Sequence, residues 1–190
     1  QLGGVYIRPH SVWTSLTLVK NIAAEIGIAK TARTVPDILG QIIDELRAQP
    51  RLLIFDEMEF LVKRQLVEII RDVLDETSIP VMMIGEETLP GKLKEWERVD
   101  NRILVRAPAQ PASEQDALKL RDHYCPRLTV ADDLALAFRD ACKGITRRIV
   151  VNLMEAQRVA IDEGQDTMTL AHWGNRPIEN GHVPVRRAVR

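Results

Sequence analysis

Several features are scarce or missing in this sequence of 190 residues, and each absence excludes a class of protein. The two cysteines, Cys125 and Cys142, are too few for a disulfide framework, and they lack metal-ligand spacing. No apolar run approaches the length of a membrane-spanning helix, and nothing at the start resembles a signal peptide. We therefore predict a cytoplasmic protein without a membrane partner.

An excess of charge of one sign is also missing. Lysine and arginine number 26 against 27 acidic residues, which gives a formal net charge of −1. This balance argues against a protein that coats nucleic acid through bulk charge, but it permits a local basic patch. Hydrophobic residues make up 45% of the chain and charged residues 28%, as is typical of a globular protein.

A glycine-rich phosphate loop of the form Gly-x-x-x-x-Gly-Lys-[Ser/Thr] is absent as well. Gly91 and Lys92 come nearest, but they lack both the upstream glycine and the following hydroxyl residue. The chain begins at Gln1 rather than Met, and the strand pattern Val5–Arg8 follows almost at once. We therefore expect a piece of a longer protein, or a processed one, with an N-terminal part missing.

The first half of the chain alternates between strand and helix patterns. Apolar runs predict strands at residues 5–8, 52–55, 79–85 and 102–105. Amphipathic periodicity predicts helices at residues 11–27, 34–49, 63–77 and 90–100, with Ser11 and Thr34 at the first two N-termini. Strands that alternate with helices indicate a parallel sheet covered on both faces, and hence an α/β fold.

The pattern changes after a joint rich in proline and alanine, residues 107–115. Beyond it only helices are predicted, at residues 113–124, 130–142 and 145–163. We therefore predict an α/β core over residues 1–107, a small all-helical domain over residues 108–173 and a flexible basic tail over residues 174–190.

Two adjacent acids, Asp56 and Glu57, follow the apolar strand 52–55. Ligands of open α/β sheets bind beyond the carboxyl ends of the strands, so this pair is expected at a site. An apolar strand followed by two acids is the Walker B pattern, in which the first acid holds Mg²⁺ and the second acts on the attacking water. Adjacent carboxylates repel each other unless a cation lies between them. The alternative is an ordinary helix start, where acids favour the helix dipole.

Five further polar residues are candidates for the same site. Glu86 follows the next strand, where it would sense a terminal phosphate or the water, unless it is a solvated loop acid. Arg98 and Arg102 lie four residues apart, where either would reach a neighbouring subunit's nucleotide as an arginine finger, unless both are solvated. Arg147 or Arg148, in a Gly-x-x-Arg pattern at a helix start, would respond to the terminal phosphate.

This order of motifs resembles the AAA+ ATPases. The resemblance implies a Walker B pair at Asp56 and Glu57, sensor 1 near Glu86, an arginine finger near Arg102 and sensor 2 at Arg147. It covers most of residues 4–163 and implies a P-loop NTPase core, N-terminally truncated before the strand at residue 5, and a helical lid. ATP and Mg²⁺ are the cofactors that it implies for the intact protein.

Within the AAA+ ATPases the chain looks most like the transposition ATPases of the phage Mu B type. The segments that carry this likeness are VYIRPHSVWTSLTLVKNIAAEIG, LLIFDEMEFL, VLDETSIPVMMIGEE and WERVDNRI. The likeness implies a protein that oligomerises as a filament on double-stranded DNA with ATP and delivers that DNA to a transposase. Lys20, Lys30 and Arg33 would face DNA in such an assembly, or they are solvated charges.

The missing phosphate loop separates this chain from the family pattern. Because that loop normally holds the phosphates, we expect the intact parent to hydrolyse ATP and this chain to be inactive. Two alternatives stay open: an AAA+ switch similar to origin-recognition or clamp-loader proteins, and a degenerate AAA+ module that serves only for protein contacts.

Overall fold

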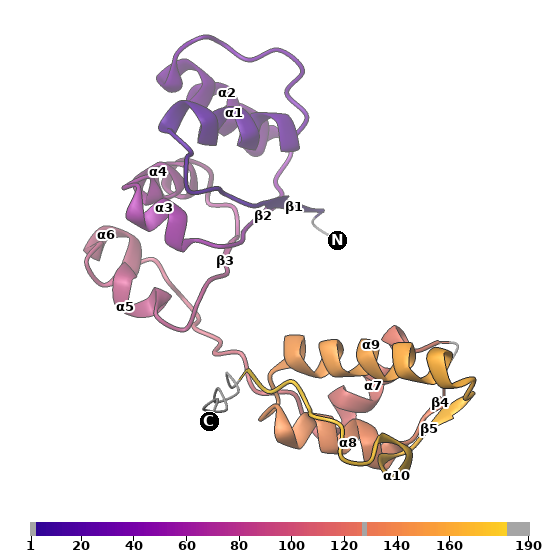
Figure 1. The fold of residues 1–190 in the computed structure, drawn as a ribbon. Helices are drawn as coiled ribbons and strands as arrows, with labels where there is room; N and C mark the ends of the chain where they lie inside the picture. Colours follow the sequence, from indigo (N-terminus) through magenta and orange to yellow (C-terminus); the bar gives the residue numbers. More distant parts are fainter. Residues whose placement is uncertain (1–2, 127–128, 182–190) are drawn as a thin grey trace, which may run out of the picture. The chain divides into compact units, whose positions relative to one another are not determined.

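The computed structural model describes residues 3–126 and 129–181. The chain forms two compact units, residues 1–108 and residues 109–190, called here the N-terminal and the C-terminal unit (Figure 1). Each unit has its own cluster of buried hydrophobic side chains. In the part of the chain that the structure describes, no helix is both long and apolar enough to cross a membrane.

The N-terminal unit is built on a parallel sheet with the order β1-β2-β3. Its strands are β1 (Gly4–Ile7), β2 (Leu52–Phe55) and β3 (Val81–Met83). Ile7 pairs with Phe55, which pairs with Met83, so the three strands end together at one edge of the sheet. Buried and more exposed residues alternate along β1 and β2, because successive side chains of a strand point to opposite faces and only one face packs against the core.

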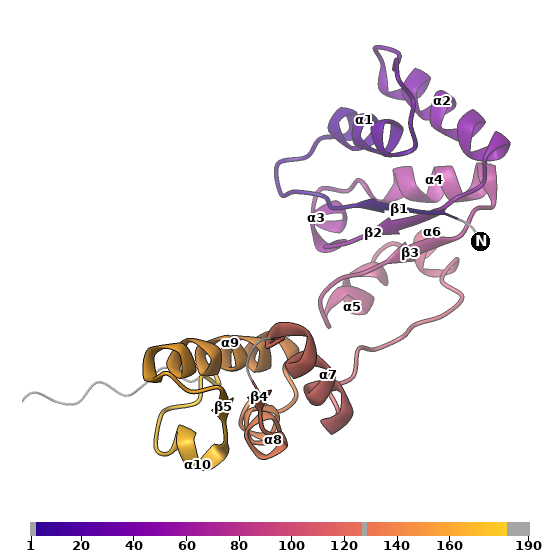
Figure 2. The same cartoon turned by 90° about the vertical axis from the view of Figure 1, so that its right-hand side faces the viewer.

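Helices cover one face of this sheet. They are α1 (Ser15–Glu25), α2 (Val35–Ala48) and α4 (Val67–Thr77), which lie together on one side in Figure 2. The strands follow in sequence order in one direction, so right-handed crossovers place both helical connections on the same face. On the opposite face Tyr6 is 51% and Met82 48% exposed. The sequence predicted helices on both faces of the sheet, and for the described residues this prediction is wrong.

The predicted helices form with corrected ends. Thr14, rather than Ser11, caps α1, whereas Thr34 caps α2 as predicted. The helix predicted over residues 63–77 begins later, at Val67, as α4, and a short helix that was not predicted, α3 (Glu59–Lys63), precedes it; Gln65 lies between them at a φ of 59°. A residue with left-handed backbone angles cannot continue a right-handed helix, so Gln65 interrupts the helical backbone between α3 and α4.

The strand predicted at residues 102–105 does not form. Short helices α5 (Leu89–Leu93) and α6 (Glu97–Asp100) precede this segment. Leu104 is 95% and Val105 80% exposed, and neither residue pairs with a described strand. An apolar segment becomes a strand only beside a neighbour that takes its backbone hydrogen bonds, and here none of the described strands does so.

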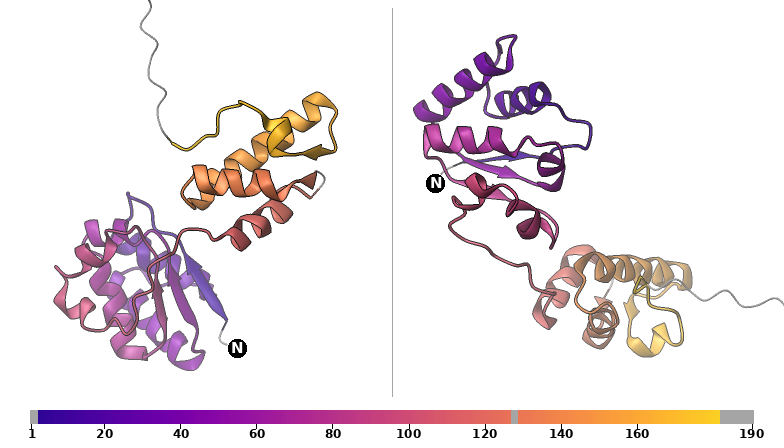
Figure 3. Two further views of the ribbon diagram at one scale, coloured as in Figure 1. Left: turned by 90° about the horizontal axis from the view of Figure 1, so that it is seen from below. Right: turned by 90° about the vertical axis from the view of Figure 1, so that its left-hand side faces the viewer.

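The C-terminal unit is mainly helical, as Figure 3 shows. Its described helices are α7 (Glu114–Tyr124), α8 (Asp132–Ala141), α9 (Thr146–Glu163) and α10 (Leu170–Trp173). Phe138 and Trp173 meet edge to face in the core, with ring centroids 5.1 Å apart. Two short strands that the sequence did not predict, β4 (Thr129–Val130) and β5 (Thr167–Met168), pair in parallel.

Residues 174–181 differ from the flexible tail predicted for residues 174–190. Asn152, a buried polar residue of α9, donates from its amide to the Glu179 carbonyl oxygen at 2.9 Å and accepts from the Glu179 backbone N–H at 2.8 Å. Ile178 packs against the hydrophobic core of the unit. This segment is therefore part of the folded unit, and residues 182–190 lie outside the described residues.

Candidate functional site

Asp56 and Glu57 lie at the carboxyl edge of the sheet, directly after β2. The Asp56 backbone N–H donates to the Ile7 carbonyl at 3.0 Å, and the Ile84 N–H donates to the Phe55 carbonyl at 2.8 Å. The acid pair is thereby fixed between the segments that follow β1 and β3. This is the edge where α/β sheets bind ligands.

Two side chains from β1 and its end hold the acid pair. The Tyr6 hydroxyl donates to Oδ2 of Asp56 at 2.5 Å, and the Glu57 backbone N–H donates to Oδ1 of the same carboxylate at 2.9 Å. Arg8 donates to Oε1 of Glu57 from Nε at 3.2 Å and also from Nη2. Both carboxylates are therefore held within the chain.

The sequence reasoning missed Tyr6 and Arg8. Residues two apart in a strand point to the same face, and the register Tyr6↔Ile54 brings this face of β1 beside Asp56. The polar residues at alternate positions of the first strand were a signal, but fifty residues separate them from the acids. Only the pairing of β1 with β2 brings the four side chains together.

The contacts of this cluster have electrostatic consequences. The hydrogen bond to Asp56 raises the pKa of the Tyr6 hydroxyl, because loss of the phenolic proton would place a second negative charge beside the carboxylate. The bond to Glu57 likewise raises the pKa of Arg8. Glu57 has a φ of 52°, in the left-handed region that residues with a side chain seldom adopt.

The acid pair fits a magnesium ion that is held mainly by water and phosphate. In the described part of the chain, no group of three or more His, Cys, Asp or Glu side chains could enclose a metal. Mg²⁺ commonly binds one or two carboxylates and takes its remaining oxygens from water and substrate phosphates. The 190 residues contain no glycine-rich phosphate loop, so the chain's own residues fit the metal ion but not the triphosphate.

Glu86 lies at the same edge, after β3. Its carboxylate is exposed and pairs with Lys92 at 3.5 Å. Its backbone N–H donates to the Glu59 carboxylate, which fixes the start of the loop. The structure therefore places the predicted sensor residue on the expected edge, with a lysine as its present partner.

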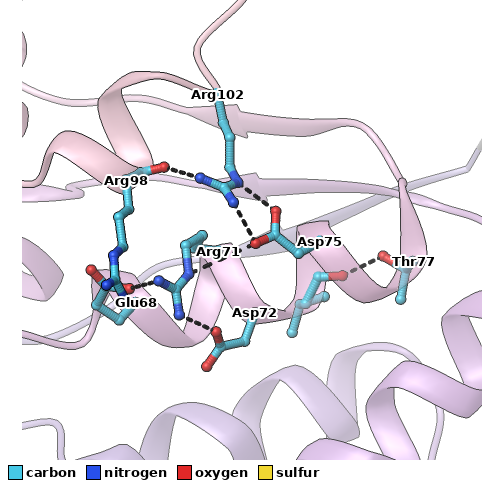
Figure 4. A network of polar contacts seen from close by, with 8 residues as sticks. Glu68, Arg71, Asp72, Asp75, Thr77, Arg98 and Arg102 are labelled. Carbon is cyan, nitrogen blue, oxygen red and sulfur yellow. Dashed lines mark hydrogen bonds and ion pairs between the residues drawn. The ribbon is translucent and has the colours of Figure 1, made fainter.

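The two candidate arginine fingers differ in their contacts (Figure 4). Arg102 donates from Nη2 to Oδ2 of Asp75 at 2.7 Å, and from Nε to the other oxygen of the same carboxylate. This pair lowers the pKa of Asp75. The Arg98 side chain has no hydrogen bond or ion pair to the described residues; its carbonyl accepts from Arg102. Arg98 is therefore the less restrained of the two.

The two arginines at the start of α9 also differ. Arg148 is partly buried and donates from Nη1 to the Asn180 carbonyl, so its guanidinium holds the segment at residues 174–181. Arg147 is exposed, and no ion pair joins it to the residues described here. Between these candidates for a phosphate-responding cation, Arg147 is the one that is accessible.

The three candidate DNA contacts lie close together in the sequence. Lys20 is an exposed residue of α1, and Lys30 and Arg33 are exposed residues of the connection between α1 and α2. No ion pair holds any of these side chains within residues 3–126 and 129–181. Their charges are thus available to an anionic partner.

Comparison with known proteins identifies the type of this fold. A sequence profile of the family described as "AAA domain" matches residues 2–93. Among solved structures, the Aeropyrum pernix ORC1 protein in complex with DNA matches with a TM-score of 0.68 and 15% identity, over 90% of this chain and 49% of that chain. CDC6P from Pyrobaculum aerophilum matches with a TM-score of 0.57 and 14% identity, over 87% of this chain and 50% of that chain.

These matches show a fold like that of an AAA+ α/β core followed by a helical region, which is the fold class that the sequence predicted. The chain spans about half the length of the two solved structures. No curated protein gives a significant match.

Proposed function

We propose that residues 2–93, which match an AAA domain, act with the C-terminal unit as a nucleotide-responsive switch on double-stranded DNA, as in an origin-recognition protein. The observation that carries this proposal is the position of Asp56 and Glu57 at the carboxyl edge of the parallel sheet, within an AAA+ fold. The ORC1 protein of similar fold was solved in complex with DNA, which supports a DNA partner for this chain.

Five of the candidate residues have a role in this proposal. In the intact protein, Asp56 would hold Mg²⁺ through water, and Glu57 would orient the water that attacks the terminal phosphate. Glu86 would sense that phosphate from the end of the next strand. Arg98, whose side chain makes no hydrogen bond or ion pair with the described residues, would supply positive charge to a neighbouring subunit's nucleotide, and Arg147, a residue of the C-terminal unit, would be the cation that responds to nucleotide.

Transposition is the second candidate function. The sequence segments that resemble the phage Mu B type favour it, and it requires ATP, a homo-oligomer on DNA and a transposase. Both solved structures reported above are instead named for ORC1 and CDC6P, so they favour the origin-recognition alternative. An ATPase assay on the full-length protein with DNA separates the two, since only the transposition function predicts further stimulation by a transposase.

The proposed metal role is tested by nucleotide binding to this chain. We expect a fluorescent ATP analogue to bind weakly, with a Mg²⁺-dependent part that Asp56→Asn removes. Asp44→Asn, which changes an exposed acid of α2, serves as the control and should leave binding unchanged. Equal Mg²⁺ dependence in both variants would contradict the role of Asp56.

The strength of binding tests the phosphate loop. Tight Mg²⁺-dependent binding by the 190 residues would show that a glycine-rich loop is not needed to hold the phosphates. Complete absence of Mg²⁺-dependent binding would agree with the inactivity expected of a chain without the loop, and it would give Asp56 no metal role in this chain.

A further inference from the structure

Helix α9 has a second apolar stripe, on the side that faces away from the core of its unit. Ile149 and Ala156 are fully buried against that core. On the opposite side Val151 is 45%, Met154 57% and Ile161 73% exposed. In both Figure 1 and Figure 2, α8 and α10 lie on one side of this helix. A surface helix needs only one apolar stripe to join a core, so folding of the unit does not account for the second.

The second stripe has the spacing of a helix-pairing seam. Its positions are 147, 151, 154, 158 and 161, which are separated alternately by four and three residues. Such a repeat keeps side chains in line along a helix that packs against another helix. Apolar residues occupy three of these positions, and the other two hold arginines, whose aliphatic stems can also cover apolar surface. This stripe, called here the α9 seam, therefore fits a second helix.

The charges along the α9 seam indicate which helix that is. Residues 143–148 carry three basic side chains and no acid, whereas residues 155–166 carry four acids and one arginine, a net of −3. The helix dipole has the same direction, positive at the N-terminus and negative at the C-terminus. A second α9 in antiparallel orientation would bring the positive end of each helix beside the negative end of the other. The seam is thus complementary in charge to a second copy of itself.

We propose that two copies of this chain associate through their α9 seams, with the two helices antiparallel. In the register that sets Val151 of one copy opposite Ile161 of the other, Met154 lies opposite Arg158 and packs on its aliphatic stem. Two-fold symmetry repeats each of these contacts, because the same surface is used by both copies. The inference goes beyond the proposed function, since this pairing requires neither nucleotide nor DNA.

Polar side chains at the two ends of the seam fix its direction. Arg147 is exposed, and no ion pair joins it to the residues described here. Asp162 accepts from Arg158 of its own helix through Oδ2 at 3.0 Å, and its Oδ1 takes no hydrogen bond from the described residues. In the antiparallel pair, Arg147 of one copy reaches Oδ1 of Asp162 in the other. Exposed ion pairs add little affinity, so this contact selects the orientation.

Sedimentation of the full chain tests the association. One seam of this length makes a small interface, so we expect a reversible dimer with a Kd on the order of 100 µM, measured at chain concentrations from about 10 µM to about 1 mM. Met154→Glu places a charge at the centre of the seam and should weaken the association at least about tenfold. Ile161→Glu should act in the same direction. Val12→Glu changes an exposed apolar residue of the N-terminal unit and should leave the association unchanged.

Charge reversal tests the antiparallel direction. Arg147→Glu and Asp162→Arg should each weaken the dimer by about two- to fivefold, because each places like charges together at both ends of the seam. The double variant restores opposite charges, so its association should return toward that of the unaltered chain. Circular dichroism of every variant checks that the helical content is unchanged.

Three outcomes would overturn the proposal. A monomer at every concentration refutes self-association. Equal weakening by Met154→Glu and Val12→Glu means that the copies meet through a surface other than the α9 seam. Loss of the dimer in both single charge variants without recovery in the double variant refutes the antiparallel arrangement. No nucleotide is present in these measurements, so the proposed switch stands or fails independently of them.

Discussion

Gly85 connects β3 to the predicted sensor residue Glu86, and a Cβ atom there would require two side chains to move. It would lie 2.7 Å from Cδ2 of Leu89 and against the Glu59 carboxylate that accepts from the Glu86 N–H. Because both contacts are with the ends of flexible side chains, we expect Gly85→Ala to lower the free energy of unfolding by about 1 kcal/mol, the low end of the range for overpacking. Urea denaturation at neutral pH measures this change.

Gly40 offers a matched control for this substitution. It lies inside α2, and a Cβ atom there would meet no heavy atom within 4 Å. Alanine favours a helix interior over glycine, so Gly40→Ala should raise the free energy of unfolding by about 0.5–1 kcal/mol. A gain in stability from both substitutions would refute the proposed steric conflict at Gly85.

Asn152 is the residue that fastens residues 174–181 to α9. Its side-chain amide also donates to the Arg148 carbonyl at 2.8 Å, besides its two bonds with Glu179. Asn152→Ala removes these three hydrogen bonds of a buried side chain with partly buried partners, so we expect a loss of about 1–3 kcal/mol in the free energy of unfolding. Hydrogen exchange should show faster exchange of the Glu179 amide in the same variant.

Asn21 is the control for Asn152. It lies partly buried in α1 and makes a single bond from its amide to the Thr17 carbonyl at 2.9 Å. Asn21→Ala should therefore cost less than Asn152→Ala and should leave exchange at Glu179 unchanged. If the two variants lose equal stability, the hydrogen bonds between Asn152 and Glu179 do not stabilise the fold more than an ordinary side-chain hydrogen bond within a helix.

At the scale of elements, α7 has the most complete N-terminal cap in the described chain. The Asp116 backbone N–H donates to the Ser113 hydroxyl at 3.2 Å, and the Ser113 N–H donates to the Asp116 carboxylate at 3.0 Å. Ser113→Ala removes the hydroxyl from this capping box, so we expect a loss of about 1 kcal/mol in the free energy of unfolding. Thermal or urea unfolding measures it.

The same cap predicts a dependence on pH. Hydrogen bonds from the Ser113 side chain and backbone lower the pKa of Asp116 in the folded state. This contribution to stability is therefore present above the unfolded pKa of about 3.9 and is lost as the pH falls through the folded value. The stability difference between the unaltered chain and Ser113→Ala should shrink on acidification, and a constant difference would contradict this.

Most elements could be predicted from periodicity, because amphipathic helices and apolar strands bury one side-chain row. The break at Gln65 could not be predicted, since the apolar positions continue on both sides of it. The strand at residues 102–105 was predicted from composition alone, but strand formation also requires a neighbouring strand.

The candidate site also has a part that the sequence predicts and a part that it does not. The position of Asp56 and Glu57 at the sheet edge can be predicted, because the two acids directly follow a buried strand in the sequence. The contacts of Tyr6 and Arg8 depend on strand register, which one sequence does not reveal. Contacts made through pairing between distant segments are therefore the part of the site that sequence reasoning could not supply.

At the scale of the whole molecule, the formal net charge of −1 limits how DNA can bind. Bulk attraction is absent, so affinity depends on a local group of cations such as Lys20, Lys30 and Arg33. Changing these three residues to Gln should weaken binding to duplexes of different sequence alike, since phosphate contacts carry no base information. Fluorescence anisotropy over a series of salt concentrations measures both the affinity and its salt dependence.

The salt dependence decides whether these three residues touch DNA. Each phosphate contact adds about 0.9 to the steepness of log K against log salt, so the triple variant should lose up to about 3 units of slope. Changing the exposed lysines Lys63, Lys94 and Lys119 to Gln alters the net charge equally and should leave the slope nearly unchanged. Equal losses of slope in the two triple variants would mean that only net charge matters, and that the connection between α1 and α2 is not the DNA-binding surface.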